Sequence, residues 1–360
     1  MKLLDKYILK KFLVTFFFVV GLLVIVIVVI DFTERNDKFI RNNVNGSMIL
    51  DFYLSYIPWI ANLIAPITVF ITSVLVTTGM AAKTEIVAIL SGGISFRRMM
   101  LPYFIGASVI AATSFYANGW LIPNANKFRI GFEIEHLKKP FYFNERDIHF
   151  KIAESDYLYM ERYNNRSEVG YRVTMEKIDE VNKKLLAKLT ARKMTWDDSL
   201  MTWQLKNWEL RVINDFGETF TNGEVLDTLI SLTPEDFDNK YQLNETMNLT
   251  ELNDHIQLLT LRGADDIAVY QNEKNIRYML PFTALILTFM GVSVSAEKST
   301  RGGAGFKIAL GFLIAFVFII MFVLVKAIAE AGSMNPLLAI WIPNIIGAVA
   351  TVILYRFVPK

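Results

Sequence analysis

The chain alternates between polar segments and six long apolar runs that contain no charged residue. Each run has at least about 18 residues, the length that a helix needs to cross the hydrocarbon core of a bilayer. The runs cover Phe12–Ile30, Phe52–Ala82, Met99–Asn126, Tyr278–Ala296, Ile308–Val325 and Ala331–Tyr355. This pattern predicts six membrane-spanning helices, which places both chain ends on the same side of the membrane.

The first run is predicted to be a retained helix and not a cleaved signal peptide. It is longer than the apolar core of such a peptide, and the polar stretch DFTERNDKF follows it where a small-residue cleavage site would stand. Lysine and arginine are concentrated before the first run, between the second and third, between the fourth and fifth, and after the sixth. Because short cytoplasmic loops carry an excess of these residues, we expect both termini in the cytoplasm.

A polar segment of domain size, residues 127–274, separates the third run from the fourth. The stretches Asp156–Tyr163 and Thr202–Ile213 are aromatic and β-branched with partial alternation, and the sequences WDDS and NDFGE are typical of hairpin turns. We therefore expect a β-sandwich or a jelly-roll domain on the outer side of the membrane. Its tryptophans are interpreted as apolar core, with a surface that holds a sugar or a lipid as the alternative; they are Trp196, Trp203 and Trp208.

The predicted fold class is therefore an α-helical integral membrane protein with six transmembrane helices and an inserted β domain. Residues 1–126 hold the first three spans, 127–274 the β-rich domain, and 275–360 the last three spans. A helix is predicted near the end of the insert. Thr250 is its expected N-cap, since threonine accepts a hydrogen bond from the first turn.

Composition excludes several kinds of function. The hydrophobic content is 53%, and the net charge of +2 gives no case for a nucleic-acid partner. Cysteine is absent, which excludes disulfides, iron–sulfur clusters and thiolate metal sites, and the three histidines are scattered along the chain. We therefore expect no cofactor and no metal centre. An enzyme of lipid or sugar transfer in the membrane would need acidic or histidine residues at the ends of the spans, where they are sparse, so no catalytic residue is predicted.

A source of energy for transport is also missing from the chain itself. The sequence has no GxxxxGK[ST] phosphate-binding loop, and no ionisable side chain stands at the centre of a span, where ion-coupled carriers place them. Lys326 and Glu330, at the end of the fifth span, are four residues apart and are predicted to pair with each other. The alternative for Lys326 is contact with a substrate or a partner.

The stretch KTEIVAILSGGISFRR, residues 83–98, predicts a short cytoplasmic helix at 84–93 between the second and third spans. Ile86, Ile89 and Leu90 recur at helical spacing and form an apolar stripe. Thr84 is the expected N-cap, and the pair Gly92-Gly93 can end the helix.

Two uses are open for this helix: packing on the bilayer surface, or docking into a groove of a soluble partner. A helix that lies on lipid usually has lysine and arginine on its polar face, and this one does not. Docking is therefore favoured, with Glu85 meeting an arginine of the partner and small residues allowing close approach. These small residues are Ala88, Ser91 and Gly92.

Three motifs carry a resemblance to a known family. They are LLDKYILKKFL (Leu3–Leu13) at the start of the chain, KTEIVAILSGGISFRRM at the predicted short helix, and NPLLAIWIPNIIG (Asn335–Gly347) in the last span. Together with six spans and a strand-rich insert between the third and fourth, they resemble the LptF/LptG permease family of lipopolysaccharide export. In this family the insert is a periplasmic β-jellyroll, so the resemblance implies a periplasmic β-jellyroll-like domain here. The opening LLDKY is more similar to LptG than to LptF.

The resemblance implies a bacterial inner-membrane transport subunit that hydrolyses no ATP itself. Its expected partners are a homologous LptF/LptG permease as heterodimer partner, an LptB-type ATPase dimer, and LptC- and LptA-type proteins. It would extract lipopolysaccharide from the membrane and pass it to a periplasmic bridge. The family's coupling helix corresponds to the predicted short helix, and the ATPase-coupling residues would be Glu85, Ala88, Ile89 and Gly92.

One feature departs from the family pattern. Relatives of LptG tend to carry basic residues at the outer end of the first span, where they can meet lipid A phosphates, whereas Asp31 and Glu34 begin this edge. Candidate headgroup contacts come slightly later, at Arg35, Lys38 and Arg41, and at Lys326; an ordinary solvated loop is the alternative for the first three. A different class of function also stays open, namely a membrane-anchored envelope scaffold or sensor with a ligand-binding β domain.

Overall fold

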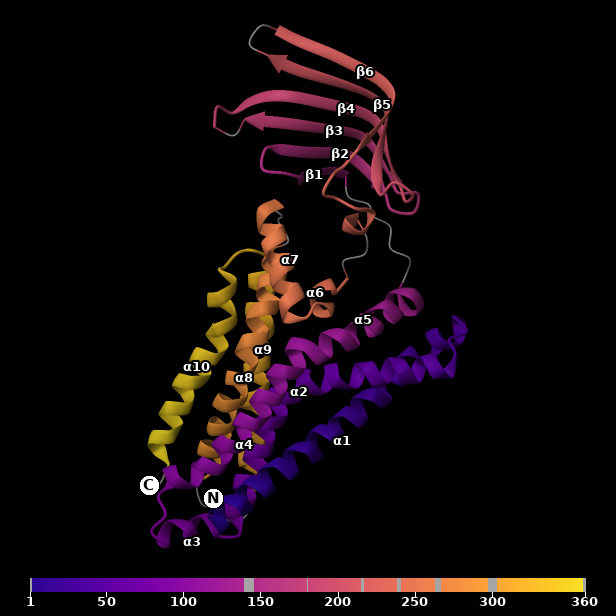
Figure 1. Ribbon diagram of the computed structural model, residues 1–360. Coiled ribbons are helices and arrows are strands. Elements are labelled where there is room, and N and C mark those ends of the chain that lie inside the picture. The colour runs from indigo at the N-terminus through magenta and orange to yellow at the C-terminus, as the bar shows by residue number, and fades with distance from the viewer. Residues whose placement is uncertain are drawn as a thin grey trace. The chain divides into compact units, whose positions relative to one another are not determined.

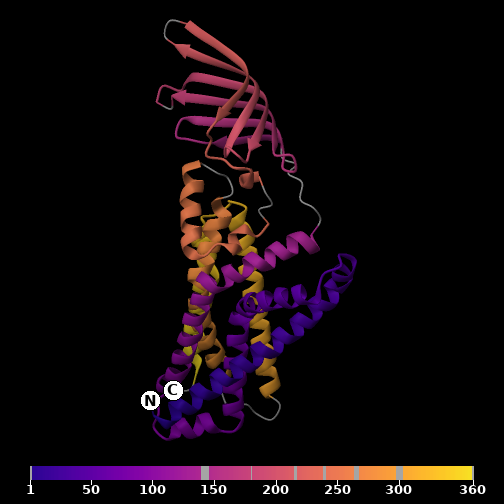
Figure 2. The same cartoon turned by 45° about the vertical axis from the view of Figure 1, so that its right-hand side comes forward.

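The computed structural model contains a helical unit and a sheet unit (Figures 1 and 2). It describes residues 2–138, 146–179, 181–214, 217–237, 241–262, 267–296 and 303–358. The helical unit consists of residues 1–138, 242–252 and 268–360, and the sheet unit of 139–241 and 253–267. Among the described residues, six helical segments are long and apolar enough to cross a membrane, and an antiparallel sheet is inserted between the third and the fourth. The predicted fold class is confirmed.

The six spans follow one another in the helical unit. The third is a composite in which two short π-helical segments, η1 and η2, interrupt an otherwise α-helical run. The short helix α3 lies between the second and third spans. The elements are α1 (Leu3–Arg41), α2 (Gly46–Ala82), α3 (Glu85–Ser91), α4 (Phe96–Tyr116), η1 (Ala117–Leu121), α5 (Ile122–Phe132), η2 (Glu133–Leu137), α8 (Ile267–Ser295), α9 (Gly303–Glu330) and α10 (Pro336–Phe357).

The first three spans are longer than a bilayer requires. α1 has 39 residues, which corresponds to about 58 Å at 1.5 Å per residue, against about 30 Å for the hydrocarbon core. The charged residues of α1 after the apolar run lie between Asp31 and Arg41, on the last three turns of this helix. α1 therefore has a polar extension that continues the helix beyond its apolar part.

Most helices extend beyond the predicted apolar runs, and two of the limits that differ have a clear local cause. The third span continues as helix from Asn126 to Leu137, so the beginning of the polar insert is helical and not strand. The sixth begins at Pro336 and not at Ala331, because Asn335 caps its first turn by accepting a hydrogen bond from Leu337 N at 3.0 Å. Proline suits the first position of a helix, where its missing N–H is not needed.

Glycines allow two pairs of spans to approach closely. A Cβ atom built on Gly106 of α4 would lie 2.7 Å from Phe12 Cδ1 of α1, and one on Gly291 of α8 would lie 2.0 Å from Ser73 Oγ of α2. Helices in a membrane associate through such small residues, because lipid supplies no hydrophobic force between them. These contacts hold α1 against α4 and α8 against α2.

The sheet unit contains six antiparallel strands in which every strand pairs with its chain neighbours, in the order β1-β2-β3-β4-β5-β6. The two predicted strands are present as β2 and β5, and the predicted turn WDDS joins β4 to β5. Two residues of the second predicted turn, 215–216, lie outside the described residues. The strands are β1 (Arg146–Lys151), β2 (Asp156–Asn164), β3 (Val169–Asp179), β4 (Lys184–Asp197), β5 (Thr202–Asn214) and β6 (Gly217–Thr228).

A line of irregular residues crosses the sheet. Asp147, Arg172 and Asn207, in β1, β3 and β5, have positive φ values of 56°, 50° and 52°. In a regular strand, side chains three residues apart point to opposite faces. At this level of β4, however, Ala191 and Met194 are both buried although they are three residues apart. The pairing of the strands continues on both sides of this line. Figure 1 shows that the long strands of the sheet are curved.

The sheet unit has an apolar core around Trp203. The Trp203 side chain is fully buried, and its Nε1 donates to the Leu232 carbonyl at 2.7 Å. Trp196 and Trp208 pack partly against the same cluster. The interpretation of the three tryptophans as core thus agrees with their burial. Phe237, in the short 3-10 segment η3 (Pro234–Phe237), closes this core and is also fully buried.

Two helices follow the sheet, α6 (Leu243–Thr246) and α7 (Leu249–Arg262). Thr250 does not cap α7 as predicted. Asn248 does, because its Oδ1 accepts from the backbone N–H groups of Thr250 and Glu251 at 2.9 and 3.0 Å. Glu251 returns the contact by accepting from Asn248 N at 2.9 Å. This reciprocal pair is a capping box with asparagine in place of serine or threonine.

Candidate functional site

The predicted short helix is α3, and its two ends have different local causes. Thr84 precedes it in a left-handed conformation, and its hydroxyl bonds to the Lys83 carbonyl instead of capping the helix. The prediction of Thr84 as N-cap is therefore wrong. The end is as predicted: Gly93 has a φ of +81°, and Gly93 and Ile94 donate to the Leu90 and Ile89 carbonyls at 3.0 and 3.3 Å. This is the Schellman pattern that glycine permits.

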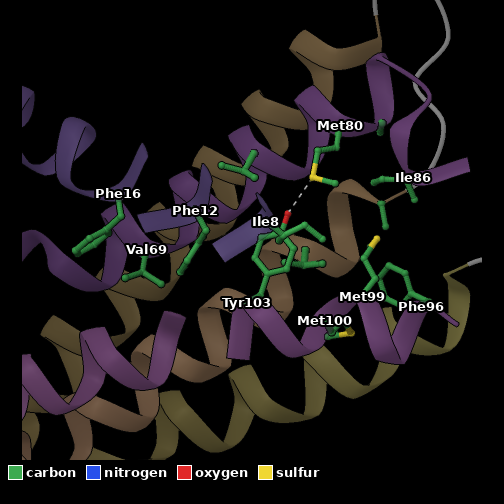
Figure 3. Close-up of a cluster of buried hydrophobic side chains, with 14 of the residues drawn as sticks. Ile8, Phe12, Phe16, Val69, Met80, Ile86, Phe96, Met99, Met100 and Tyr103 are labelled. Carbon is green, nitrogen blue, oxygen red and sulfur yellow. Dashed lines mark hydrogen bonds between the residues drawn. The ribbon is translucent and has the colours of Figure 1, made fainter. Parts of the chain in front are cut away.

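The apolar stripe of α3 packs against the protein's own core. Ile86 is 2% exposed and belongs to a cluster with side chains of α1, α2 and α4, shown in Figure 3. Ile89 and Leu90 are partly buried against the same cluster. The labelled neighbours of Ile86 in Figure 3 include Met80 of α2 and Met99 of α4. One side of α3 is thus fastened to the helical unit.

The opposite side of α3 is exposed and has only small or short side chains. Val87 is 47% exposed, and Ala88, Ser91 and Gly92 are exposed as well. The Ser91 hydroxyl donates to the Val87 carbonyl at 2.8 Å, so its one hydrogen-bond donor is already used within the helix. We call these four residues the small-residue face. Sequence reasoning missed Val87, although its spacing of one helical turn from Ser91 could have indicated it.

Glu85 stands at the first position of α3 and is held from α1. Its Oε2 accepts a hydrogen bond from the Tyr7 hydroxyl at 3.0 Å and lies 3.6 Å from Lys11 Nζ. Lys11 Nζ also donates to the Tyr7 hydroxyl at 3.1 Å. The Glu85 side chain is 27% exposed, as is that of Lys11. The three side chains form one polar group between α1 and α3.

A second charged contact fixes α1 to α4 beside α3. Arg98 donates from Nη1 and Nη2 to the two oxygens of Asp5 at 2.6 and 2.8 Å, and the backbone N–H of Lys2 donates to Asp5 Oδ2 at 2.8 Å. A bidentate pair of this kind fixes orientation as well as distance. The beginning of α1 is therefore tied to the short helix α3 through Glu85, and to α4, the helix that follows α3, through Arg98.

Both chain ends lie near α3. In Figures 1 and 2 the first turn of α1 and the last turn of α10 stand at the same end of the helical unit as α3. This agrees with an even number of spans. This end therefore carries two lysine- and arginine-rich segments, namely the beginning of α1 and the segment between α2 and α4.

The polar extension of α1 enters an ionic network at the other end of the helical unit. Arg35 donates to Asp31 at 2.9 Å and to Glu133 of η2 at 3.0 Å. The Tyr53 hydroxyl of α2 donates to the second oxygen of Asp31 at 3.0 Å. Arg35, a candidate headgroup contact, is thus engaged in contacts within the protein.

The centre of this network is Arg129, whose side chain is 2% exposed. It donates to Asn126 at 2.8 Å and to Glu245 at 3.0 Å, and its guanidinium lies 4.3 Å from the Trp59 ring centroid. Its Nη1 is also 3.5 Å from the Glu133 carboxylate. Burial raises the pKa of the Glu245 carboxyl, and the nearby Glu273 charge adds to this effect. We call Arg129 and the residues linked to it, directly or through Glu133, the Arg129 network; they are Asp31, Arg35, Asn126, Glu133 and Glu245. Sequence reasoning missed this network because most of its members are far apart in the chain.

The other candidate headgroup residues differ in how far they are engaged. Lys38 Nζ donates to the Leu137 carbonyl at 3.4 Å. Lys326 Nζ lies 3.6 Å from Glu330 Oε1, so the predicted pairing of these two residues is confirmed. Arg41 is exposed and takes part in no ion pair with any residue that the structure describes. The four candidates lie on two helices, three on α1 and Lys326 on α9. They therefore do not share one helix face.

Comparison with known protein families identifies a match over nearly the whole chain. The family model described as lipopolysaccharide export system permease LptF/LptG matches residues 6–356. A comparison with curated proteins found no match. The family match spans all six membrane helices, the short helix α3 and the inserted sheet, and it does not distinguish LptF from LptG. The chain belongs to the LptF/LptG family of lipopolysaccharide export permeases.

Proposed function

We propose that this chain is a permease subunit of a transporter that extracts lipopolysaccharide from the inner membrane and passes it to a periplasmic bridge. A separate cytoplasmic ATPase would supply the energy, because the sequence contains no phosphate-binding loop of its own. Family membership implies an export complex that includes an ABC-type ATPase and partner proteins. The support for the proposal is the family match over nearly the whole chain.

The end of the helical unit that carries α3 is proposed to face the cytoplasm. Lysine and arginine are concentrated in the segments at this end, and the positive-inside rule then gives the orientation. The same rule puts the sheet unit in the periplasm, where LptC- and LptA-type proteins would receive the lipid. An accessibility assay with single cysteines tests this, because the natural chain has none: a cysteine at Ser91 should react only after the inner membrane is made permeable.

The ATPase is proposed to bind α3 through the small-residue face together with Glu85. The observation that carries this is the division of α3 into a fastened side and an exposed side without bulky groups. Small residues allow another backbone to approach closely, and a helix seated in a groove is a recurring recognition mode. Of the four sequence-predicted coupling residues, Ala88 and Gly92 lie on the exposed side, whereas Ile89 packs inward and would act as support.

The experiment is co-purification of the permease complex with its ATPase, together with lipid-stimulated ATP hydrolysis. Glu85→Gln removes the charge while keeping the size of the side chain, and Ala88→Trp fills the small-residue face. Both are expected to reduce the yield of the complex and the hydrolysis rate. A matched control is Glu34→Gln, an exposed carboxylate on the polar extension of α1. Unchanged yield and activity in both test variants would refute the docking role.

Two apolar helices are proposed to contact the homologous permease and lipid. α1 and α9 bury the smallest shares of their apolar windows within this chain. On a soluble protein, an exposed apolar face of this kind would mark an interface. In a membrane, such a face contacts lipid or another helix. Single cysteines on the exposed side of each helix, for example at Val26 and Phe316, should crosslink to cysteines on the partner permease. If neither position crosslinks to it at any partner position, this arrangement is wrong.

Contact with lipid A phosphates is proposed for Lys38 and Arg41 more than for Arg35. Arg35 already bonds to two carboxylates, whereas Arg41 is exposed and Lys38 has only a long bond to a carbonyl. Arginine and lysine are the usual partners of phosphate oxygens. Replacing Arg41 by methionine should weaken photo-crosslinking of lipopolysaccharide to the α1 extension. Loss of crosslinking only on replacement of Lys326 would move the contact to α9.

A further inference from the structure

The starting point is that Glu85 is held by only one of its two carboxylate oxygens. The Tyr7 hydroxyl and Lys11 Nζ both contact Oε2. Within the residues that the structure describes, Oε1 accepts no hydrogen bond. A carboxylate has about four lone-pair sites, so the oxygen that is not engaged can still accept two donors of a partner. The held oxygen fixes the side chain, and the other one stays available.

The helix α3 cannot supply this restraint by itself. It has seven residues, a length at which an isolated helix is unstable in water. Thr84 gives it no side-chain cap, and Glu85 occupies its first position, where the backbone has no preceding turn to pack against. The position of the Glu85 carboxylate therefore depends on the neighbouring element that contacts it, which is α1.

The part of α1 that contacts Glu85 is itself fixed. Tyr7 and Lys11 are four residues apart and so lie on the same helix face. Between them, Ile8 is fully buried in the cluster of Figure 3, and Phe12 follows it there. Asp5 adds the bidentate contact with Arg98. The two donors to Glu85 thus project from a segment that is anchored on either side of them.

We infer that Tyr7 and Lys11 are positioning residues, which hold Oε2 of Glu85 so that Oε1 receives a cationic side chain of the ATPase. The inference rests on the proposed docking role of α3 and adds the residues that prepare it. A carboxylate that is already oriented loses less side-chain freedom on binding, and this gain is the usual benefit of preorganisation.

The expected effects follow from the two kinds of contact. Tyr7→Phe removes one hydrogen bond to a charged group, and such a loss corresponds to roughly a 10-fold weaker association between permease complex and ATPase. Lys11→Met removes a longer, partly exposed contact, for which about a twofold weakening is expected. Lys10→Met is the matched control, because Lys10 is exposed and makes no ion pair with a described residue. It should leave the association unchanged.

The experiment is a double-mutant cycle on the full permease complex in lipid nanodiscs, with ATPase binding measured by titration. The variants are Tyr7→Phe, Lys11→Met, Glu85→Gln and the two combinations with Glu85→Gln. If Tyr7 acts through Glu85, Tyr7→Phe weakens binding in the natural chain and has no further effect when Glu85→Gln is present. A merely structural role of Tyr7 would instead give the same weakening in both backgrounds.

The outcomes separate the two proposals. If Glu85→Gln weakens binding but Tyr7→Phe acts equally with and without it, the positioning role is refuted and the docking role stands. If Tyr7→Phe has no effect in the natural chain, the positioning role is refuted as well. If Glu85→Gln itself leaves binding unchanged, the docking role of Glu85 is refuted, and the positioning role falls with it.

Discussion

The Arg129 network predicts a large difference between two substitutions that are two residues apart on the same helix. Arg129→Met replaces a side chain that is 2% exposed by an apolar one of similar length. It removes the hydrogen bond to Glu245 at 3.0 Å and the contact with Glu133 at 3.5 Å. Lys127→Met removes a single ion pair with Glu251, in which the two side chains are 50% and 43% exposed.

The magnitudes follow from the burial of the charges that stay behind. Removing one partner of a buried ion pair costs about 3–5 kcal/mol, because the other charge stays unpaired in a poorly solvated place. Two features limit the loss here: Glu133 keeps its bond with Arg35, and Glu245 already has a raised pKa, so it can take up a proton. We therefore expect the lower end, about 3 kcal/mol. An exposed pair such as that of Lys127 contributes only about 0–1 kcal/mol.

Thermal unfolding of the purified chain in detergent measures both variants. At about 2–4 °C for each kcal/mol, Arg129→Met should lower the melting temperature by roughly 6–12 °C, and Lys127→Met by at most about 4 °C. Adding Glu245→Gln to Arg129→Met should restore part of the loss, since one unpaired charge is removed. Equal shifts for Arg129→Met and Lys127→Met, or a double variant less stable than Arg129→Met, would refute the reasoning.

Two further predictions concern packing and pH. Gly291→Ala should destabilise the helical unit by about 1–3 kcal/mol, because its Cβ would lie 2.0 Å from Ser73 Oγ, whereas Gly21→Ala, with nothing within 4 Å, should not; equal melting temperatures would contradict this. The Asn248 backbone N–H holds the pKa of Glu251 below its usual value of 4.5, so its stabilising contribution is present above that pH and is lost as the pH falls through the lowered pKa. Glu251→Gln should therefore reduce the drop in melting temperature between neutral and acidic pH, and an unchanged drop would contradict the assignment.

The apolar pattern located the six spans because the bilayer imposes a simple requirement on sequence. A spanning helix needs a long run without charge, and this requirement does not depend on which other helix it meets. The pattern was less informative about where helices continue past the membrane. The extension of the third span to Leu137 contains ordinary polar residues, and contacts such as that between Arg35 and Glu133 stabilise it.

The short helix α3 shows the same division on a smaller scale. Its existence and its end at Gly93 were predictable, because glycine is the residue that tolerates the left-handed conformation there. The role of each face was not predictable from periodicity. Ile86 and Ile89 form an apolar stripe whether it docks onto a partner or onto the chain itself, and only the cluster of Figure 3 shows the second.

The sequence by itself determined the membrane spans, the strand-rich insert, the short helix and, through its motifs, the family. These features depend on composition and local spacing, which are properties of neighbouring residues. The tertiary structure alone decided that Tyr7 and Lys11 hold Glu85, that Asp5 pairs with Arg98, and that Arg129 is the centre of a buried network. Each of these joins residues distant in the chain, and their meeting depends on how whole helices pack, which local spacing does not contain.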